Sequence, residues 1–374
     1  MNKIKKLKMT IAILTFSDFN TNYGSILQAF ALRCFLQEHG HKVTFIKYRE
    51  YNKFITKSFR SEIKKYAVKA YHFLYSAQEK RRKDNFQAFI QSNIPHTPLY
   101  TSEQDLESNL NENFDAYICG SDQIWNINIL GGLREPYFLK FVPQGRRKIA
   151  YGPSMGEYNP VGEELVRIKE MLKSFDFIST REQSSSVFLS TVLKKKVLTV
   201  VDPTLMLDGA QWLSAIGKKK LPKGDYAVCY CVRRNPLALK LVSRLKEIYN
   251  VPIYNVSDNL INVPGTQKDY ISCGPEMFVN LVAGAKFCVG TSFHLAVFST
   301  IFNKHCFIAG SMHNKNRILG IFGLIGREDH LIFDNAVIED RRSLSIKEGN
   351  INRELLDKMI LKSKKSLLNA LKNE

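Results

Sequence analysis

Polar residues capable of chemistry form four clusters, and each cluster follows a short apolar run. The clusters cover residues 20–25, 120–126, 179–184 and 290–294. Each apolar run is typical of a buried strand, and a stretch with helical spacing follows the clusters 20–25, 179–184 and 290–294. Because ligands of open α/β sheets bind beyond the carboxyl ends of the strands, we interpret the four clusters as parts of one site.

His294 and Arg181 provide the groups expected at an anion-binding site. His294 follows Thr291 and Ser292 at the start of a predicted helix. A neutral imidazole can transfer a proton, an imidazolium can bind an anion, and a helix N-terminus favours negative charge. Arg181 follows the strand predicted over 175–180, a suitable position for binding a phosphate or a carboxylate. We therefore predict an anion site that includes a proton-transfer group.

The cluster 120–126 combines hydrogen-bonding groups with an aromatic ring. Asp122 could act as a general acid or base. Ser121 and Gln123 offer donors and acceptors, and Trp125 offers a ring that could stack on a sugar. This combination suits a carbohydrate ligand. The competing interpretation is a helix cap at Asp122 and a core position for Trp125.

The turn at 20–25 joins the first predicted strand to the first predicted helix. Backbone N–H groups near Asn22 and Gly24 could hold an anion or a sugar hydroxyl. The competing interpretation is an ordinary polar turn and helix cap. Arg181 and His294 have structural alternatives as well, namely a surface ion pair and a hydrogen-bonded core histidine.

The elements that must position these clusters alternate between short strands and longer helices. This alternation predicts an α/β fold with two Rossmann-like, doubly wound domains that face a cleft. We expect an N-terminal domain over 1–205, a C-terminal domain over 206–345 and a final helix in 346–374. The segment from about 51 to 92 breaks the alternation and predicts a helical insertion in the N-terminal domain.

This insertion is strongly basic. Residues 57–83 hold nine basic and two acidic side chains and end in Lys80-Arg81-Arg82-Lys83. One interpretation is a pair of solvated surface helices. The alternative is a surface that meets an anionic membrane or a phosphorylated acceptor.

The overall composition excludes some classes of function but does not identify one. The chain of 374 residues has 54 Lys and Arg against 35 Asp and Glu, a formal net charge of +19, which favours acidic partners. No apolar run approaches the roughly 20 residues needed to cross a bilayer. Seven cysteines, most of them in apolar runs, predict reduced thiols in a cytoplasmic protein. No zinc-type spacing, dinucleotide fingerprint or nucleic-acid-binding motif is present, so we expect no metal and no nucleic-acid partner.

The clusters together resemble the polysaccharide pyruvyl transferase family. The matching stretches are Asn-Tyr-Gly-Ser at 22–25, Gly-Ser-Asp-Gln-Ile-Trp-Asn at 120–126, Ser-Thr-Arg-Glu at 179–182, Val-Asp-Pro-Thr at 201–204 and Thr-Ser-Phe-His at 291–294. They keep the family's order over about residues 10–330. One departure is Leu295-Ala296, where members often have Gly-Thr after the histidine.

The resemblance implies a two-Rossmann scaffold of the GT-B type that uses phosphoenolpyruvate as donor. The family's reaction moves the pyruvyl skeleton onto sugar hydroxyls, leaves a pyruvate ketal and releases phosphate. The resemblance implies no further cofactor and no metal. It implies catalytic roles for His294, Asp122 and Arg181, donor binding by Arg181, Thr291, Ser292 and His294, and acceptor binding by Asn22, Gly24, Ser121, Asp122, Gln123 and Trp125.

The acceptor implied by the resemblance is a saccharide, for example a galactose-type residue of a surface-polysaccharide repeat carried on a polyprenyl diphosphate. With the basic charge, this predicts a cytoplasmic enzyme that docks peripherally on the anionic inner face of the cell membrane. A basic enzyme without membrane contact is the competing expectation. The alternative functions are a nucleotide-sugar glycosyltransferase on the same scaffold, a non-catalytic nucleic-acid-binding protein and a flavin-type redox partner, of which the first is the strongest.

Overall fold

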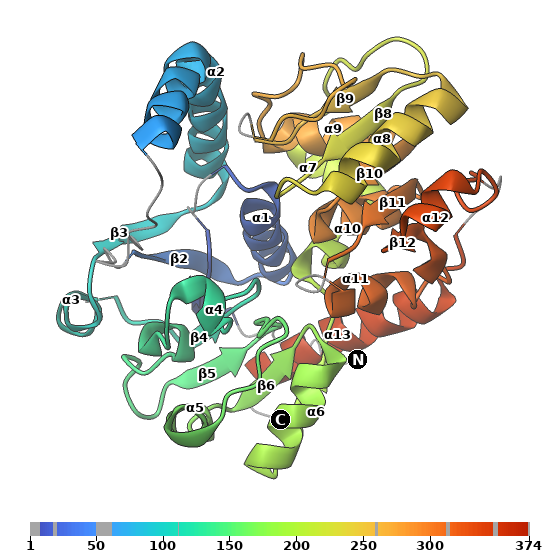
Figure 1. The fold of residues 1–374 in the computed structure, drawn as a ribbon. Helices are drawn as coiled ribbons and strands as arrows, with labels where there is room; N and C mark the ends of the chain where they lie inside the picture. The colour runs from blue at the N-terminus through green and yellow to red at the C-terminus, as the bar shows by residue number, and fades with distance from the viewer. Residues whose placement is uncertain are drawn as a thin grey trace.

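The computed structural model describes residues 8–17, 21–49, 62–110, 112–258, 261–311, 315–346 and 351–372, with backbone only for 62–75. Two parallel β-sheets, each covered by helices, lie on either side of the central helix α1 (Tyr23–Glu38) (Figure 1). We call the part built on the first sheet the N-terminal domain and the part built on the second sheet the C-terminal domain.

The N-terminal sheet has seven strands in the order β3-β2-β1-β4-β5-β6-β7, and every neighbouring pair is parallel. Helices connect most successive strands, as parallel pairing requires. The strands are β1 (Thr10–Leu14), β2 (Lys42–Tyr48), β3 (His96–Tyr100), β4 (Ala116–Cys119), β5 (Arg147–Ala150), β6 (Phe177–Thr180) and β7 (Leu198–Thr199). Their helices are α1, α2 (Glu62–Asn93), α3 (Glu103–Asn109), α4 (Ile127–Leu130), α5 (Gly162–Lys173) and α6 (Gln183–Leu193), with the 3₁₀ turn η1 (Glu135–Phe138).

The C-terminal sheet has five parallel strands in the order β12-β11-β10-β8-β9. They are β8 (Ala227–Tyr230), β9 (Ile253–Asn255), β10 (Phe287–Gly290), β11 (His305–Ala309) and β12 (Leu331–Ile332). The helices are α8 (Pro236–Tyr249), α9 (Pro275–Gly284), α10 (Phe293–Ile301), α11 (Lys315–Phe322) and α12 (Asn335–Glu339), with the 3₁₀ turn η3 (Glu328–His330).

Strand order reverses once in each sheet, and the reversals place the predicted clusters. In the N-terminal sheet β1 lies between β2 and β4, and in the C-terminal sheet β8 lies between β9 and β10. At such a reversal, the chain leaves two neighbouring strands toward opposite faces of the sheet. A crevice therefore forms beyond the carboxyl ends of these two strands. Cluster 20–25 follows β1, cluster 120–126 follows β4 and cluster 290–294 follows β10. The topology therefore brings these clusters toward the space between the domains.

The described part of the basic segment lies in the helix α2, between β2 and its parallel neighbour β3. The predicted segment 51–92 begins outside the described residues, which resume at 62. The described part is one helix of 32 residues and not a helix pair. Strand β3 was not predicted, because His96–Tyr100 contains Pro98 and lacks a clear alternation of apolar residues.

Two segments of chain pass between the domains. The first runs from β7 to β8 through η2 (Pro203–Met206) and α7 (Gly209–Ile216), and the predicted border at 205/206 falls within η2. The second is the C-terminal helix α13 (Glu354–Leu371), which packs back onto the N-terminal domain. The Val201 amide donates to Ser363 Oγ on α13 (3.1 Å), and Arg147 Nη1 donates to the Ala370 carbonyl (2.9 Å).

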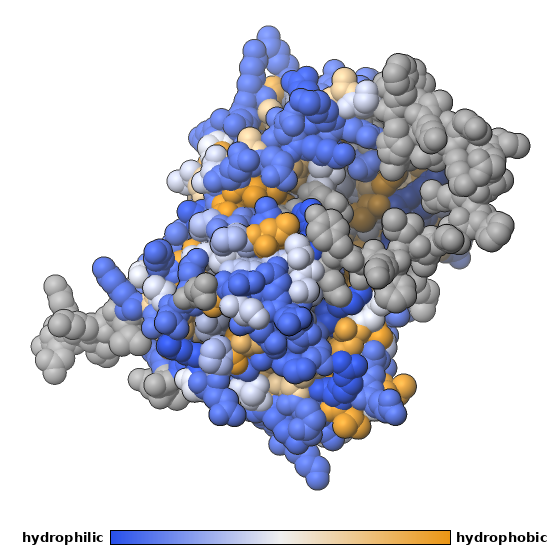
Figure 2. All heavy atoms as spheres, turned by 90° about the vertical axis from the view of Figure 1, so that its left-hand side faces the viewer, coloured by the Kyte–Doolittle hydropathy of each residue, from blue (hydrophilic) through white to orange (hydrophobic). Residues whose placement is uncertain are grey.

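The face of the molecule seen in Figure 2 is mainly hydrophilic where it is coloured. Figure 2 shows one face on which hydrophobic side chains occur as small separate patches. Among the described helices, none has both the length and the apolar character required to cross a membrane.

Arg82, within the basic run of α2, is buried and connects the two domains. Its Nη1 donates to the carbonyls of Val256 (3.1 Å) and Ile271 (2.6 Å) in the C-terminal domain, and its Nη2 donates to the Thr21 carbonyl (3.2 Å). The guanidinium also lies over the Tyr23 ring, 4.7 Å from its centroid. Neither interpretation of the basic segment predicted a buried arginine. Its charge is instead satisfied by backbone carbonyls, as buried cations require.

We predict that Arg82→Met lowers the free energy of unfolding by about 3 kcal/mol, because it leaves buried carbonyls without donors. Arg81→Met is the matched control, since Arg81 is exposed on the same helix turn and its loss is expected to change stability by less than about 0.5 kcal/mol. Urea unfolding followed by circular dichroism measures both. Equal stability of the two variants would contradict the structural role of Arg82.

Candidate active site

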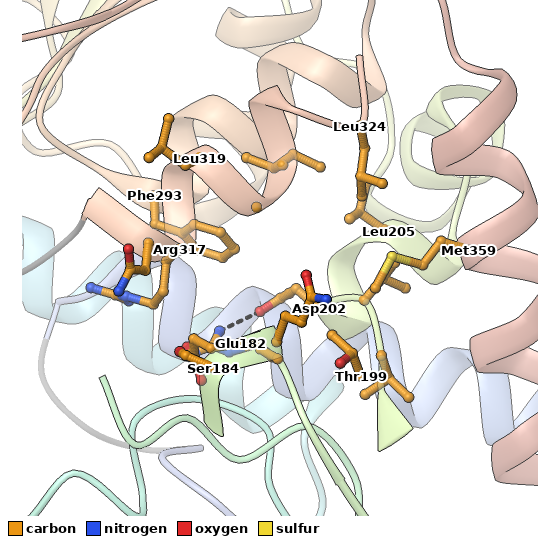
Figure 3. Close-up of a pocket in the computed structure, with 17 residues that line it drawn as sticks. Glu182, Ser184, Thr199, Asp202, Leu205, Phe293, Arg317, Leu319, Leu324 and Met359 are labelled. Carbon is orange, nitrogen blue, oxygen red and sulfur yellow. Dashed lines mark hydrogen bonds and ion pairs between the residues drawn. The ribbon is translucent and has the colours of Figure 1, made fainter. Parts of the chain in front are cut away.

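A cavity of about 580 Å³ lies between the domains, and residues from both domains line it. A second cavity of about 420 Å³ adjoins it (Figure 3), and Phe293 and Arg317 line both. Predicted residues that line the first cavity are Asn22, Asp122, Gln123, Thr291, Ser292 and His294, and Arg181 lines the second. The structure thus brings four clusters, far apart in the chain, to one interdomain region.

The loop after β10 is fixed by hydrogen bonds to its own hydroxyls. Ser292 caps α10, and its Oγ accepts a hydrogen bond from the Leu295 amide (3.3 Å). Thr291 Oγ1 accepts from the Val232 amide (2.9 Å), which ties the loop to the end of β8. These bonds hold His294 in the first turn of α10, a helix that is buried from His294 to Ile301. Its orientation therefore follows from the packing of α10.

His294 packs directly against the first turn of α1. Asn22 caps this helix, with Oδ1 accepting from the amides of Gly24 (2.9 Å) and Ser25 (3.3 Å). A Cβ atom on Gly24 would lie only 2.0 Å from His294 Nδ1. Gly24 is therefore the residue that allows the imidazole of the C-terminal domain to approach the N-terminal domain. Asn22 serves as a helix cap and also lines the cavity.

Asp202 joins His294 to Arg181. Its Oδ2 lies 3.5 Å from His294 Nε2 and 2.5 Å from Arg181 Nη1, and its side chain is completely buried. Its Oδ1 accepts from the Thr204 amide (2.9 Å) and from Thr204 Oγ1 (2.6 Å). Burial raises the pKa of Asp202, but His294 and Arg181 outweigh it and hold this pKa well below its usual range. The carboxylate is therefore a fixed negative charge between the His294 imidazole and the Arg181 guanidinium.

Arg181 lies between two carboxylates. Its Nη2 is 3.6 Å from Asp122 Oδ1, and its side chain is 3% exposed. Arg181 Nε and Nη2 are buried without a hydrogen-bond partner in the described part of the chain. The alternative interpretation of Arg181 as a surface ion pair is wrong, because the guanidinium is buried at the domain interface. A buried guanidinium with unused donors is suited to bind an additional anion.

Asp122 and Gln123 reach the cavity from the loop after β4. Asp122 has φ of +66°, a left-handed conformation that Asp tolerates better than most residues. Its Oδ1 accepts from the Gln123 amide (2.8 Å), and Gln123 Oε1 accepts from Asn126 Nδ2 (3.0 Å). The loop therefore orients its polar side chains through bonds among themselves.

Two predicted acceptor-binding residues belong to the core instead. Ser121 is completely buried, and its Oγ donates to the Gly152 carbonyl (2.8 Å). Trp125 is 1% exposed, stacks on Phe138 at 5.0 Å between ring centroids and donates from Nε1 to the Tyr137 carbonyl (2.9 Å). The prediction that these side chains contact a sugar is wrong, because both are enclosed by protein. Gly24, a third predicted acceptor-binding residue, packs against the imidazole of His294.

Sequence reasoning missed three charged residues at this interface: Asp202, Glu182 and Arg317. Asp202 was part of the matched stretch 201–204, yet no role was assigned to it, although an Asp directly after a strand was a usable signal. Glu182 Oε1 accepts from Ser154 Oγ (2.6 Å), and burial raises the pKa of Glu182. Arg317 lies on α11, a helix that was not predicted, and no local pattern distinguished it.

Within the described ranges, no group of three or more His, Cys, Asp or Glu residues is arranged to hold a metal ion.

Comparison with solved structures shows the fold. The chain is similar to UDP-GlcNAc 2-epimerase from Methanocaldococcus jannaschii, with a TM-score of 0.57, 12% identity and coverage of 98% of this chain and 100% of that one. It is also similar to UDP-GlcNAc 2-epimerase from Neisseria meningitidis bound to UDP-GlcNAc, with a TM-score of 0.51, 10% identity and coverage of 98% and 100%. These likenesses place the two domains in the GT-B type of two-Rossmann fold.

Comparison with curated proteins gives no match. The family model for polysaccharide pyruvyl transferase matches residues 22–311, a span that runs from the cap of α1 past the strand β11. The matched span contains His294, Asp202, Arg181 and Asp122, the groups that meet between the domains. The chain belongs to the polysaccharide pyruvyl transferase family.

Proposed function

We propose that this protein transfers the pyruvyl group of phosphoenolpyruvate to two hydroxyls of a sugar residue, forming a pyruvate ketal and releasing phosphate. The observation that carries the proposal is the buried Asp202 carboxylate, which holds His294 and Arg181 together beside a cavity between the domains. This arrangement supplies a proton-transfer group next to an anion-binding group. Family membership supports the class of reaction.

The reaction needs proton transfer and binding of a highly charged donor. Protonation of the donor's methylene carbon makes C2 electrophilic, and the first sugar hydroxyl adds there. The C2–O bond to phosphate then breaks with its electron pair on oxygen, and the second hydroxyl adds to C2. Two hydroxyl protons are lost in all, so one balances the proton gained by the new methyl group and the other leaves on phosphate.

His294 is the proposed proton-transfer group, and Asp202 is the residue that positions it. Asp202 Oδ2 lies 3.5 Å from His294 Nε2, so its charge is next to the imidazole. The two bonds from Thr204 fix the carboxylate in turn. Such support of a proton-transfer histidine by a buried carboxylate holds the ring in one orientation.

The remaining roles follow from the positions around the cavity. Arg181 is proposed to bind an anionic group of the donor, and Thr291 and Ser292 lie where hydroxyls can contact donor oxygens. Asp122 is the proposed base for an acceptor hydroxyl. Gln123 and Asn22, which line the same cavity, are the proposed hydrogen-bonding partners of the sugar. No metal or further cofactor enters this scheme.

The proposed acceptor is a galactose-type residue in a lipid-linked surface-polysaccharide repeat. The net charge of +19 and the exposed lysines of α13, Lys358, Lys362 and Lys365, support docking of the protein on an anionic membrane surface at the cytoplasmic face.

A nucleotide-sugar glycosyltransferase is the second candidate. It is favoured by one observation, the similarity of fold to an epimerase bound to UDP-GlcNAc. The two candidates differ in the leaving group, which is phosphate in one case and a nucleotide in the other.

We predict acceptor-dependent release of phosphate from phosphoenolpyruvate by the wild-type protein, tested with galactose-, glucose- and mannosamine-containing acceptors, including lipid-linked ones. His294→Ala is expected to lower the rate by at least about 100-fold, since it removes the proton-transfer group. His39→Ala, at the other end of α1, is the control and should keep wild-type activity. Release of a nucleotide from nucleotide sugars, with no binding of phosphoenolpyruvate in calorimetry, would sink the proposal.

We predict that Gly24→Ala lowers kcat/KM by about 100-fold, because the added Cβ displaces the imidazole by about an ångström or more. Gln37→Ala is the control, since Gln37 is exposed near the other end of the same helix and lines neither cavity. Circular dichroism should show that both variants fold. Full activity in Gly24→Ala would mean that the position of His294 against α1 does not matter for the reaction.

We predict that the protein sediments with anionic liposomes at low salt and is released at high salt, because the attraction is screened. Neutral liposomes are the control. Absence from the pellet of anionic liposomes even at low salt would exclude the docking hypothesis.

A further inference from the structure

Arg317 lies on the wall that separates the two cavities. It occupies the first turn of α11, in the C-terminal domain, and lines both cavities. In Figure 3 it lies beside Phe293 at the polar end of the second cavity, while Leu205, Leu324 and Met359 form the apolar end. Arg317 is therefore adjacent to the proposed active site but comes from the domain opposite Arg181.

Arg317 and Arg181 both pack against Phe293. The guanidinium carbon of Arg317 lies 5.6 Å from the ring centroid, and that of Arg181 lies 5.3 Å from it. Burial and then the charge of Arg181 lower the pKa of Arg317, although Glu182, Asp122 and Asp202 offset part of this effect. Two cations brought together in this way favour the binding of an anion near both.

Arg317 has a buried donor that none of the described protein groups uses. Its Nε is buried without a hydrogen-bond partner, and no carboxylate of the described residues lies within ion-pair distance of its guanidinium. Arg181, which is 3% exposed, likewise has Nε and Nη2 without hydrogen bonds. A buried guanidinium without a partner is costly, and an anionic ligand that accepts from it removes this cost.

The residue before Arg317 fixes the start of α11 to the other domain. Asn316 Nδ2 donates to Glu157 Oε2 of the N-terminal domain (2.5 Å). This bond holds Arg317 near Arg181 in the present arrangement of the domains. The two arginines are thus assembled by contacts between the domains and not by one local segment.

We propose that Arg317 is a second donor-binding residue, which together with Arg181 holds the two anionic groups of the donor from opposite domains. The proposal rests on the proposed function, because phosphoenolpyruvate carries both a phosphate and a carboxylate. Two planar guanidiniums can bind two such groups through paired hydrogen bonds. A donor with a single anionic group would gain less from this arrangement.

Calorimetric titration of the full chain with phosphoenolpyruvate tests the proposal, with inorganic phosphate as competitor. Arg317→Met is expected to weaken binding of phosphoenolpyruvate by about 10- to 100-fold, the range for loss of a charge-assisted hydrogen bond. Arg317→Lys keeps the charge but loses the planar fork, and it should recover only part of the affinity. Lys315→Met is the matched control, since Lys315 is an exposed cation two residues away on α11, and it should bind as the wild type does.

The outcomes distinguish a failure of the proposed role of Arg317 from a failure of the proposed donor. If wild type binds phosphoenolpyruvate and both Arg317 variants bind it equally well, the role of Arg317 is overturned while the proposed function stands. If Arg317→Met does not fold, as judged by circular dichroism, Arg317→Lys decides in the same way. If wild type does not bind phosphoenolpyruvate, the donor and the proposal for Arg317 are both overturned. Titration with UDP-GlcNAc then shows whether the glycosyltransferase candidate replaces them.

Discussion

The buried carboxylate of Asp202 is the interaction on which the candidate site depends. It lies at the end of the N-terminal domain, contacts Arg181 of the same domain and faces His294 of the other. Because the group is inaccessible to solvent, its negative charge must be compensated by groups in contact with it, and Arg181 and Thr204 supply such contacts from the same side of the interface. The further contact to His294 forms only where the two domains meet. Gly24 allows the meeting, since any larger residue would occupy the position of the imidazole.

The sequence was sufficient to predict the architecture because strand and helix periods were clear in most segments. The apolar patterns predict strands over 42–48 and 287–290 and helices over 162–173 and 236–249, and β2, β10, α5 and α8 have these bounds. The strands of both domains lie in parallel sheets. Elements with mixed composition were missed, among them β3, which contains a proline, and the short α11. These elements owe their conformation to contacts with distant parts of the chain, which a local pattern does not contain.

The sequence predicted part of the site, because position after a strand indicates which edge of the sheet a residue lies at. Residues after strands were expected to share an edge of a sheet, and Asn22, Asp122, Gln123 and His294 do line one cavity. Position after a strand does not say which way a side chain points. The indole of Trp125 turns into the core against Phe138, although its neighbour Gln123 faces the cavity. Arg317 was beyond prediction, because only the packing of the two domains brings it near Arg181.

The return of α13 to the N-terminal domain has a mechanical consequence. Two bodies joined by a single tether can rotate relative to each other about any axis. Here the chain crosses between the domains twice, once in the segment between β7 and β8 and once before α13. Two fixed points leave a single easy rotation, about the line that joins them. A rotation that widened the space between the domains would have to turn about that line and also break the bonds of Arg82 to the C-terminal domain, so the two crossings and Arg82 together keep the side chains of the site in register.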